Sequence, residues 1–211
     1  MLSKTNKPLH SRSPMPRLFV AIDIPDSLRA MLHGMGRGIP GARPVSEDQI
    51  HLTLRFIGDV EGGMFRDFKE ALAEVKALPF SLAVQGVGHF PPRGAPRVLW
   101  AGLSRSNELV LLRNRIERRL VACGLPAEQR KFAPHITIAR LKDSPARRVG
   151  DFLAGNSLFQ SEEFSVESFV LYSSRLIKSG AVHTVEQQYF LAGEDRSFAG
   201  PVKRAALPSA G

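Results

Sequence analysis

The sequence predicts an α+β protein with internal duplication, in which helices pack on antiparallel or mixed sheets. The first observation is that the tetrapeptide HLTL at residues 51–54 returns in the second half of the chain as HITI at 135–138. The second is that strand-like and helix-like segments alternate around both copies. The third is composition. With 43% hydrophobic and 23% charged residues, 211 positions suit one globular core, or two lobes that share a core.

The elements of the first half follow from the spacing of apolar residues and from the residues that end them. They are a strand at 17–24, a short helix capped by Asp26 or Ser27, a strand at 49–57, a helix at about 62–78, and strands at 80–87 and 98–103. Pro25 closes the first strand and Pro79 stops the longer helix. A loop rich in proline and glycine, at 89–96, joins the last two strands.

The second half begins with the clearest helix of the chain. In order, the elements are a helix at about 106–123, a strand at 134–141, a helix near 146–154, and strands at 158–164, 168–175 and 182–191. The first of these helices has a buried stripe with helical spacing, formed by Leu109, Leu112, Ile116, Leu120 and Cys123. Its other face carries arginines that we expect to be solvated, namely Arg113, Arg115, Arg118 and Arg119. Cys123 is predicted to be a small core residue rather than a nucleophile.

The formal net charge of +9 favours an anionic partner such as RNA, a nucleotide or another phosphate ester. Part of this charge lies at the ends of the chain. Residues 1–16 are predicted to be a disordered basic tail and 192–211 a second disordered tail, which leaves one domain at 17–191. Met15 is a second candidate for the initiator. A single cysteine excludes an intrachain disulfide and predicts a cytoplasmic location. No apolar run reaches the length of a membrane span, so no membrane partner is expected.

The repeated tetrapeptide has the period-two alternation of a half-buried strand. On such a strand, His51 and Thr53 point to one face while the two leucines enter the core, and His135 and Thr137 repeat the arrangement. Two imidazoles that face each other across a groove can move protons on opposite sides of a phosphorus atom without a metal. The threonine hydroxyls can donate hydrogen bonds to the phosphate oxygens, where negative charge grows during the reaction.

A single His-x-Thr is more often a satisfied histidine on a polar strand face than a catalytic group, and it is the repetition that favours catalysis. The remaining histidines lack this context. His10 lies in the predicted tail, His33 near a helix end and His89 in the proline-rich loop, and His183 has no threonine two residues on. A zinc site needs three or four ligands at metal spacing, and no glycine-rich phosphate loop is present. We therefore expect neither a metal nor a cofactor.

The motifs and their flanks resemble a known family. The opening RLFVAIDIP at 17–25, the two repeated tetrapeptides, and KFAPHITIAR at 131–140 are similar to the two-histidine phosphoesterase superfamily. Within it, the best match is to the RNA 2′,3′-cyclic phosphodiesterases of bacteria and archaea, also called 2′-5′ RNA ligases. The resemblance spans about 17–191. It implies two pseudo-symmetric lobes with helices on the outer faces and both motif strands lining a central groove.

The resemblance also implies roles for individual residues. His51 would be the proton donor to the leaving 3′-oxygen, His135 the proton acceptor that activates water, and the product a 2′-phosphate. Thr53, Thr137 and Arg140 would bind the phosphate. Strand parity sets Arg140 on the face opposite His135, so Arg140 needs a bulge or the end of the strand to reach the groove. Arg55 has the parity of His51 and Thr53 and is a weaker candidate.

Three readings of function remain open at this point. The first is hydrolysis of RNA or nucleotide 2′,3′-cyclic phosphates, with RNA ends (tRNA fragments among them) or cyclic nucleotides as substrates of a monomeric enzyme. The second is 2′-5′ RNA ligation by the reverse reaction, which would use the same residues. The third is an RNA-binding module without catalysis, which the basic charge suggests but the scarcity of Trp and Tyr disfavours. Phe19 or Phe56 is a candidate to stack on a base.

Overall fold

The computed structural model describes residues 16–177 and 180–192. Its elements are β1 (Arg17–Ile22), α1 (Asp26–Met35), β2 (Ala42–Pro44), the 3-10 helix η1 (Glu47–Gln49), β3 (Leu52–Asp59), α2 (Gly62–Ala73), β4 (Phe80–Leu82), β5 (Val84–Phe90), β6 (Val98–Leu103), α3 (Asn107–Ala122), β7 (His135–Leu141), α4 (Ala146–Gly155), β8 (Phe164–Val166), β9 (Ser168–Ile177) and β10 (Gly180–Phe190). Apart from their innermost residues, the predicted tails at 1–16 and 192–211 lie outside the described residues. Among the described residues, no helix is both long and apolar enough to cross a membrane.

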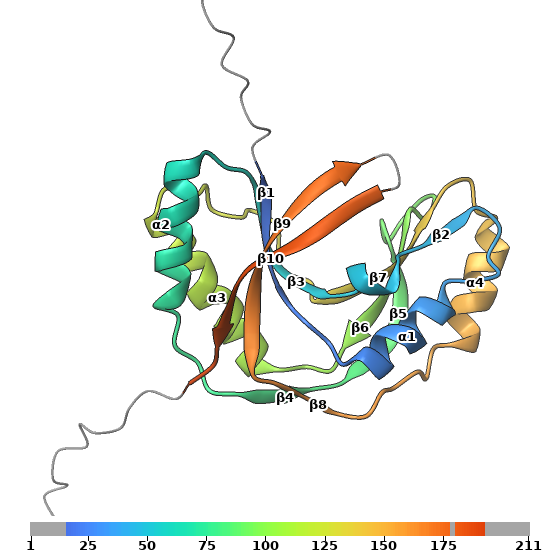
Figure 1. Cartoon of the computed structure of the whole chain (residues 1–211). Helices are drawn as coiled ribbons and strands as arrows, with labels where there is room; N and C mark the ends of the chain where they lie inside the picture. Colours follow the sequence, from blue (N-terminus) through green and yellow to red (C-terminus); the bar gives the residue numbers. More distant parts are fainter. Residues whose placement is uncertain (1–15, 178–179, 193–211) are drawn as a thin grey trace, which may run out of the picture.

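The larger sheet has eight antiparallel strands in two halves. Its order is β10-β9-β1-β3-β7-β6-β5, with β2 added beside β7. The halves meet where β3 touches β7, through the pair Leu52–Ile136. Figure 1 shows α2 and α3 beside the half that contains β1, β3, β9 and β10, and α1 and α4 beside the half that contains β5, β6 and β7. The predicted α+β fold of two lobes with outer helices is confirmed, and the junction of the lobes is the junction of the two motif strands.

The alternation of the motif strands has the predicted result in the core. Leu52, Leu54, Ile136 and Ile138 are all nearly or fully buried. Each buried side chain of this size contributes roughly 1.5–3 kcal/mol relative to an exposed one. The helix stripe is also confirmed, because its three leucines and Ile116 are buried and Ser106 caps α3 by accepting a hydrogen bond from the Leu109 N–H at 3.0 Å. Cys123 is half-buried against the core, as a small core residue would be.

Several element boundaries differ from the prediction. The first motif strand begins at Leu52, because residues 47–49 form η1. Helix α2 ends at Ala73, well before Pro79. The predicted strand at 80–87 is two strands, since β4 leaves the large sheet to pair with β8 in a separate ladder, while β5 continues to Phe90. The predicted strand at 158–164 is mostly irregular, and Leu158 is 94% exposed. The division into β4 and β5 depends on the pairing of β4 with the distant β8.

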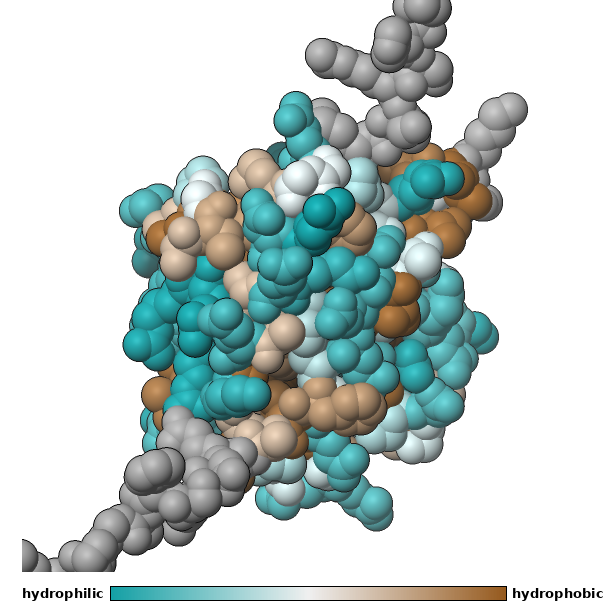
Figure 2. Space-filling view, turned by 60° about the vertical axis from the view of Figure 1, so that its left-hand side comes forward, coloured by the Kyte–Doolittle hydropathy of each residue, from teal (hydrophilic) through white to brown (hydrophobic). Residues whose placement is uncertain are grey.

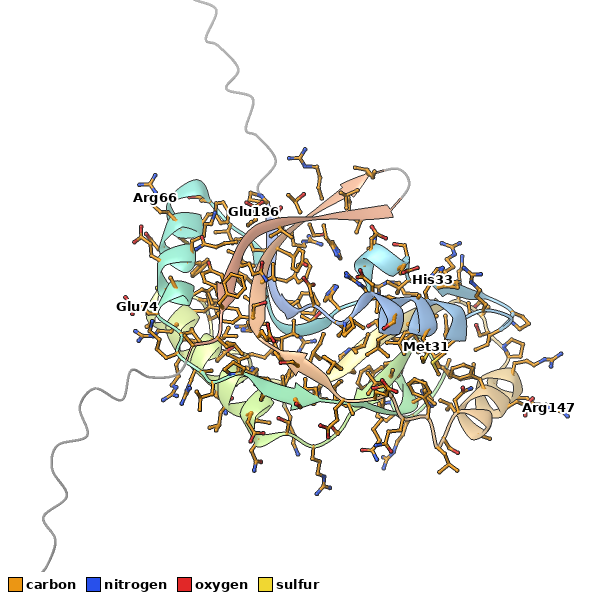
Figure 3. All side chains as sticks on the ribbon, turned by 60° about the horizontal axis from the view of Figure 1, so that its bottom comes forward. Met31, His33, Arg66, Glu74, Arg147 and Glu186 are labelled. Carbon is orange, nitrogen blue, oxygen red and sulfur yellow. The ribbon has the colours of Figure 1, made fainter. Side chains whose placement is uncertain are left out.

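Two side-chain predictions on the helices are wrong. Neither Asp26 nor Ser27 caps α1, since Pro25 is the N-cap residue and Asp26 instead pairs with Arg29. The arginines of α3 are not all solvated. The Arg113 side chain is 12% exposed and lies 3.5 Å from the Glu117 carboxylate. Arg119 pairs at 2.6 Å with Glu74, which Figure 3 labels at the end of α2. The Arg113–Glu117 pair has the i,i+4 spacing of neighbours on one helix, whereas the packing of α2 against α3 brings Glu74 to Arg119.

Part of the positive charge lies outside the space between the lobes. Arg66 on α2 and Arg147 on α4 point away from the body of the protein (Figure 3). The face in Figure 2 is largely hydrophilic, and its hydrophobic side chains lie in separate patches. The charge that could select a substrate is therefore the smaller set of arginines that face the groove.

Candidate active site

An open groove of about 890 Å³ lies between the lobes, and all five predicted site residues line it. These are His51, Thr53, His135, Thr137 and Arg140. The groove also receives side chains from β1, β2, β9 and β10. The structure therefore brings both imidazoles and both hydroxyls to one groove.

The pairing of β3 with β7 explains why the two motifs meet. Leu52 is the partner of Ile136 in an antiparallel register. His51 and Thr53 flank Leu52, and His135 and Thr137 flank Ile136, so all four side chains project to the face opposite the core. The antiparallel direction sets His51 toward Thr137 and Thr53 toward His135. The site is thus built around one strand pair, with equivalent groups from each lobe.

His51 is held in a stack of rings. Its centroid lies 4.9 Å from that of Phe19, which in turn stacks on Tyr172 at 5.2 Å. The His51 Nε2 atom lies 3.0 Å from the Thr53 hydroxyl oxygen. Burial lowers the pKa of His51 to about 4, and His183 adds to this shift by charge repulsion, while a hydrogen bond with the Gln49 backbone opposes it. In the free protein, His51 is therefore neutral at pH 7.

His135 has a defined tautomer. Its Nδ1 atom lies 2.8 Å from the Ala133 carbonyl oxygen. A carbonyl can only accept, so Nδ1 carries the proton and donates it, and Nε2 is left with the free lone pair. The ring also makes an edge contact with Phe90, with centroids 4.9 Å apart. A neutral His135 in this tautomer can accept a proton at Nε2.

A β-bulge brings Arg140 into the groove, as strand parity required. On β7, Thr137 pairs with Trp100 while Ala139 pairs with Leu99, so Ile138 is the extra residue. Ile138 and Ala139 are consecutive and both fully buried. The alternation is shifted by one after them, and Arg140 lies on the same side as His135.

The same irregularity on β3 makes the prediction for Arg55 wrong. Thr53 pairs with Ala21 and Arg55 with Val20, so Leu54 is the extra residue. Arg55 then points into the protein, where its side chain is 9% exposed. It lies 2.6 Å from the Glu117 carboxylate and donates to the backbone oxygens of Phe56 and Pro126, at 2.7 Å and 2.6 Å. Arg55 does not line the groove.

Because of the bulge at Leu54, Phe56 rather than Arg55 points into the groove. Phe56 lines the groove and is 60% exposed, at the same distance after His51 as Arg140 is after His135. Phe19 is 3% exposed because it lies beneath His51. Of the two phenylalanines considered from the sequence, only Phe56 therefore offers a free ring face to a ligand.

Two chemically important groove residues lie outside the repeated motifs. His183 on β10 lines the groove with its centroid 5.4 Å from that of His51. Burial lowers its pKa, and Asp48 opposes that shift. Arg43 on β2 lines the groove beside Arg140. Neither residue lies in a repeated motif, so spacing carried no signal for them. Of the other histidines within the described residues, His33 bonds with the Val45 carbonyl oxygen at 2.8 Å and does not line the groove.

The low pKa of His51 predicts a dependence of stability on pH. Between pH 6.5 and about 4, the unfolded chain binds a proton at this residue while the folded chain does not. Stability therefore falls as the pH falls through this window, by roughly 2 kcal/mol between pH 7 and pH 5. Urea unfolding of the wild type and His51→Gln at both pH values measures this. We expect a smaller difference in the variant, and an equal difference in both proteins would contradict the shift.

Comparisons with known proteins give a consistent result. The model of the 2'-5' RNA ligase superfamily matches residues 25–176. The chain is 35% identical over 176 residues to an RNA 2',3'-cyclic phosphodiesterase of Thermotoga maritima, covering 80% of this chain and 92% of the relative. It is 37% identical over 189 residues to a protein of the same name from Thermus thermophilus, covering 84% and 91%.

Solved structures agree with this. One from Thermus thermophilus has a TM-score of 0.70 at 31% identity, covering 84% of this chain and 99% of the other. E. coli LigT complexed with 3'-AMP has a TM-score of 0.69 at 26% identity, covering 85% and 99%.

Proposed function

This chain belongs to the 2'-5' RNA ligase superfamily, and on that premise we propose that it is an RNA 2′,3′-cyclic phosphodiesterase, a hydrolase that opens the cyclic phosphate to a 2′-phosphate. The observation that carries this conclusion is the convergence of two His-x-Thr motifs on one groove. Relatives with the phosphodiesterase name cover most of the chain and support the same activity. The proposed substrates are RNA ends or nucleotides, and this basic groove suits both.

The reaction needs a base that removes a proton from water and an acid that protonates the leaving 3′-oxygen. His135 accepts a proton from water at Nε2 as the water oxygen attacks phosphorus. The bond between phosphorus and the ribose 3′-oxygen breaks, and His51 gives its proton to that oxygen. The phosphate remains on the 2′-oxygen. The tautomer of His135, with Nδ1–H donated to Ala133, supports its role as the base.

His51 must be protonated to act as the acid, although its pKa in the free protein is about 4. A bound cyclic phosphate carries one negative charge. An anion next to an imidazole favours the charged form and raises its pKa. The substrate therefore helps to create the acid that acts on it. Thr53 lies 3.0 Å from Nε2 of His51 and is positioned to bind the same phosphate.

The remaining proposed groups stabilise negative charge. Thr53 and Thr137 donate hydrogen bonds to the non-bridging oxygens, and Arg140 pairs with them electrostatically. All three lie on strands, which hold side chains more rigidly than loops do. Phe56 is the proposed platform for the base of the terminal nucleotide, because it is the exposed aromatic ring of the groove.

Hydrolysis with EDTA present tests the proposed function. We expect the protein to open adenosine 2′,3′-cyclic phosphate and a short RNA with a 2′,3′-cyclic end at rates that EDTA does not change. Phosphorus NMR should show a 2′-phosphate as the product. Loss of turnover in EDTA with recovery on adding a divalent metal would contradict the two-histidine mechanism, and a 3′-phosphate product would reverse the assignment of the leaving oxygen.

Ligation and passive RNA binding are the less favoured readings. Ligation would open the same ring with an RNA 5′-hydroxyl in place of water. Water is far more concentrated in dilute solution, so hydrolysis is the proposed outcome, and joined tRNA halves would be the contrary result. Passive binding would leave the cyclic phosphate intact over long incubation. Among the described residues, no group of three or more His, Cys, Asp or Glu side chains is placed to hold a metal.

A cytoplasmic location and a monomeric state complete the proposal. The single cysteine supports the location, because a chain without disulfides suits a reducing compartment. Both histidine motifs come from one chain, which supports a site that is complete in the monomer. Cell fractionation tests the location. Light scattering tests the monomer, and a dimer mass at assay concentration would contradict it.

A further inference from the structure

Two arginines lie directly opposite each other at one side of the groove. Arg43 on β2 is the cross-strand partner of Arg140 on β7. Both are exposed and both line the groove. Like charges in directly opposed positions of a sheet destabilise it. An anion bound between or beside the two guanidinium groups would relieve this repulsion.

No carboxylate among residues 16–177 and 180–192 neutralises this pair. Within the described residues, neither Arg43 nor Arg140 has a carboxylate oxygen within 4.0 Å. Other arginines do have such a partner, namely Arg17, Arg29, Arg55, Arg113, Arg119 and Arg130. Arg43 and Arg140, like Arg175 elsewhere in the groove, are therefore available to an anionic ligand.

The backbone holds Arg43 in this position. The Val45 N–H donates to the Ile138 oxygen and the Lys142 N–H donates to the Gly41 oxygen, both at 2.9 Å. Gly41 has a φ of +76°, and a Cβ atom there would lie 2.2 Å from the Lys142 oxygen. Only glycine fits this close approach. Strand β2 is thus fastened to β7 at both ends, and Arg43 is a fixed part of the groove.

The charge of the substrate decides what a second arginine can bind. A nucleoside 2′,3′-cyclic phosphate has one phosphate group with one negative charge, and Arg140 with the two threonines is sufficient for it. The end of an RNA chain has a further phosphate, on the 5′-oxygen of the last nucleoside. This inference rests on the proposed function, which centres the cyclic phosphate between the histidines.

The shape of a nucleoside directs that further phosphate toward Arg43. The base and the 5′-carbon leave the ribose on opposite sides of its ring oxygen. With the cyclic phosphate at the β3–β7 junction and the base on Phe56, which belongs to the lobe of β3, the 5′-phosphate lies on the side of the ribose away from Phe56. Arg43 lies away from Phe56 on the other lobe, beside Arg140. We propose that Arg43 binds the phosphate joining the last two nucleotides, and so makes the groove selective for RNA ends over nucleoside 2′,3′-cyclic phosphates.

The test compares Arg43→Gln with the wild type on three substrates. These are adenosine 2′,3′-cyclic phosphate, the dinucleotide ApA with a 2′,3′-cyclic end, and the same dinucleotide with an uncharged methylphosphonate link. We expect the wild type to prefer the charged dinucleotide, and Arg43→Gln to lower this preference by about tenfold, through KM, as loss of a charged hydrogen bond would. The preference should also be lost with the methylphosphonate in the wild type.

Three further variants distinguish the possible outcomes. Arg140→Gln should lower kcat/KM for all three substrates. Arg147→Gln makes the same change in net charge on a side chain that points away from the body (Figure 3), and should leave the preference unchanged. Phe56→Ala should raise KM for all three substrates alike. The melting temperature of Arg43→Gln should be equal to or above that of the wild type, because a like-charge contact is removed.

One result would overturn the inference. An unaltered preference in Arg43→Gln would mean that Arg43 does not recognise the linking phosphate. A tenfold weaker inhibition by adenosine 2′-phosphate in Arg43→Gln, with unaltered preference, would assign the second arginine to the product dianion. Failure of the proposed function gives a different result, since no substrate would then be opened, or His51→Ala and His135→Ala would open them at the wild-type rate.

Discussion

Replacing either His51 or His135 with alanine is expected to lower kcat/KM for opening a 2′,3′-cyclic phosphate by about 10²–10⁴-fold, the usual effect of a well-placed acid or base. The two residues line one groove on either side of the Leu52–Ile136 pair. Each acts on a different proton in the same step, so the double variant should lose less than the product of the single losses. Single-turnover hydrolysis with EDTA present measures all three variants.

The two single variants should differ in their pH dependence. The His135→Ala variant keeps His51, so it should keep the basic limb of the profile of kcat/KM. His51 must gain a proton with the substrate, so its removal should abolish the basic limb. Circular dichroism and thermal unfolding show whether each variant is folded. If His51→Ala does not fold, His51→Gln replaces it, because the longer side chain keeps more of the contact with Phe19. Turnover at the wild-type rate in both folded variants would falsify the catalytic assignment.

Replacing Arg55 with methionine is expected to lower the free energy of unfolding by about 3 kcal/mol, because the nearly buried Glu117 carboxylate loses the nearer of its two arginine partners and two backbone oxygens lose a donor. Glu117 is 14% exposed and lies 2.6 Å from the Arg55 guanidinium, which also donates to two backbone oxygens. These contacts join β3 to α3 and to the loop that leads to His135. Urea unfolding at pH 7 gives the free energy, and a loss below about 1 kcal/mol would contradict it.

A double variant separates the stabilising role of Arg55 from a role in the groove. Arg55→Met with Glu117→Gln should recover part of the lost stability, since the nearly buried side chain at position 117 then carries no charge. Arg55→Met should keep its kcat/KM within a few fold at a temperature where it is folded, because Arg55 does not line the groove. A large loss of kcat/KM with unchanged stability would instead restore the phosphate-binding role that strand parity suggested.

The contrast between Arg55 and Arg140 shows where sequence reasoning reaches its limit. Strand parity predicted that the Arg55 side chain faces the groove. It predicted that the Arg140 side chain faces away from the groove unless the strand contains a bulge. The bulge at Leu54 on β3 and the bulge at Ile138 on β7 reverse these two placements. A bulge forms where the partner strand has one residue fewer, and the partners here are β1 and β6. No local pattern within β3 or β7 identifies the extra residue.

His183 and Arg43 were missed for a related reason. Arg43 reaches the groove through β2, which pairs with the distant β7, and His183 through the β9–β10 hairpin, which the distant β1 joins to the sheet. Neither residue has a neighbour in the sequence that would indicate a role in the groove. The signal that was available for Arg43 is its place in a short segment between Gly41 and Pro44, which is typical of a tightly held turn or edge strand.

The sequence by itself determined the local geometry of the site. Period-two alternation puts each histidine and its threonine on one face and the aliphatic pair in the core, because successive side chains of any strand point to opposite faces. Helical spacing likewise determined the buried stripe of α3, and Ser106 its cap. Only the tertiary structure decided which lobe faces which, where the strands bulge, and which distant arginines and histidine join the groove. These features depend on contacts between segments far apart in the chain. No single segment of the sequence contains the information to predict such contacts.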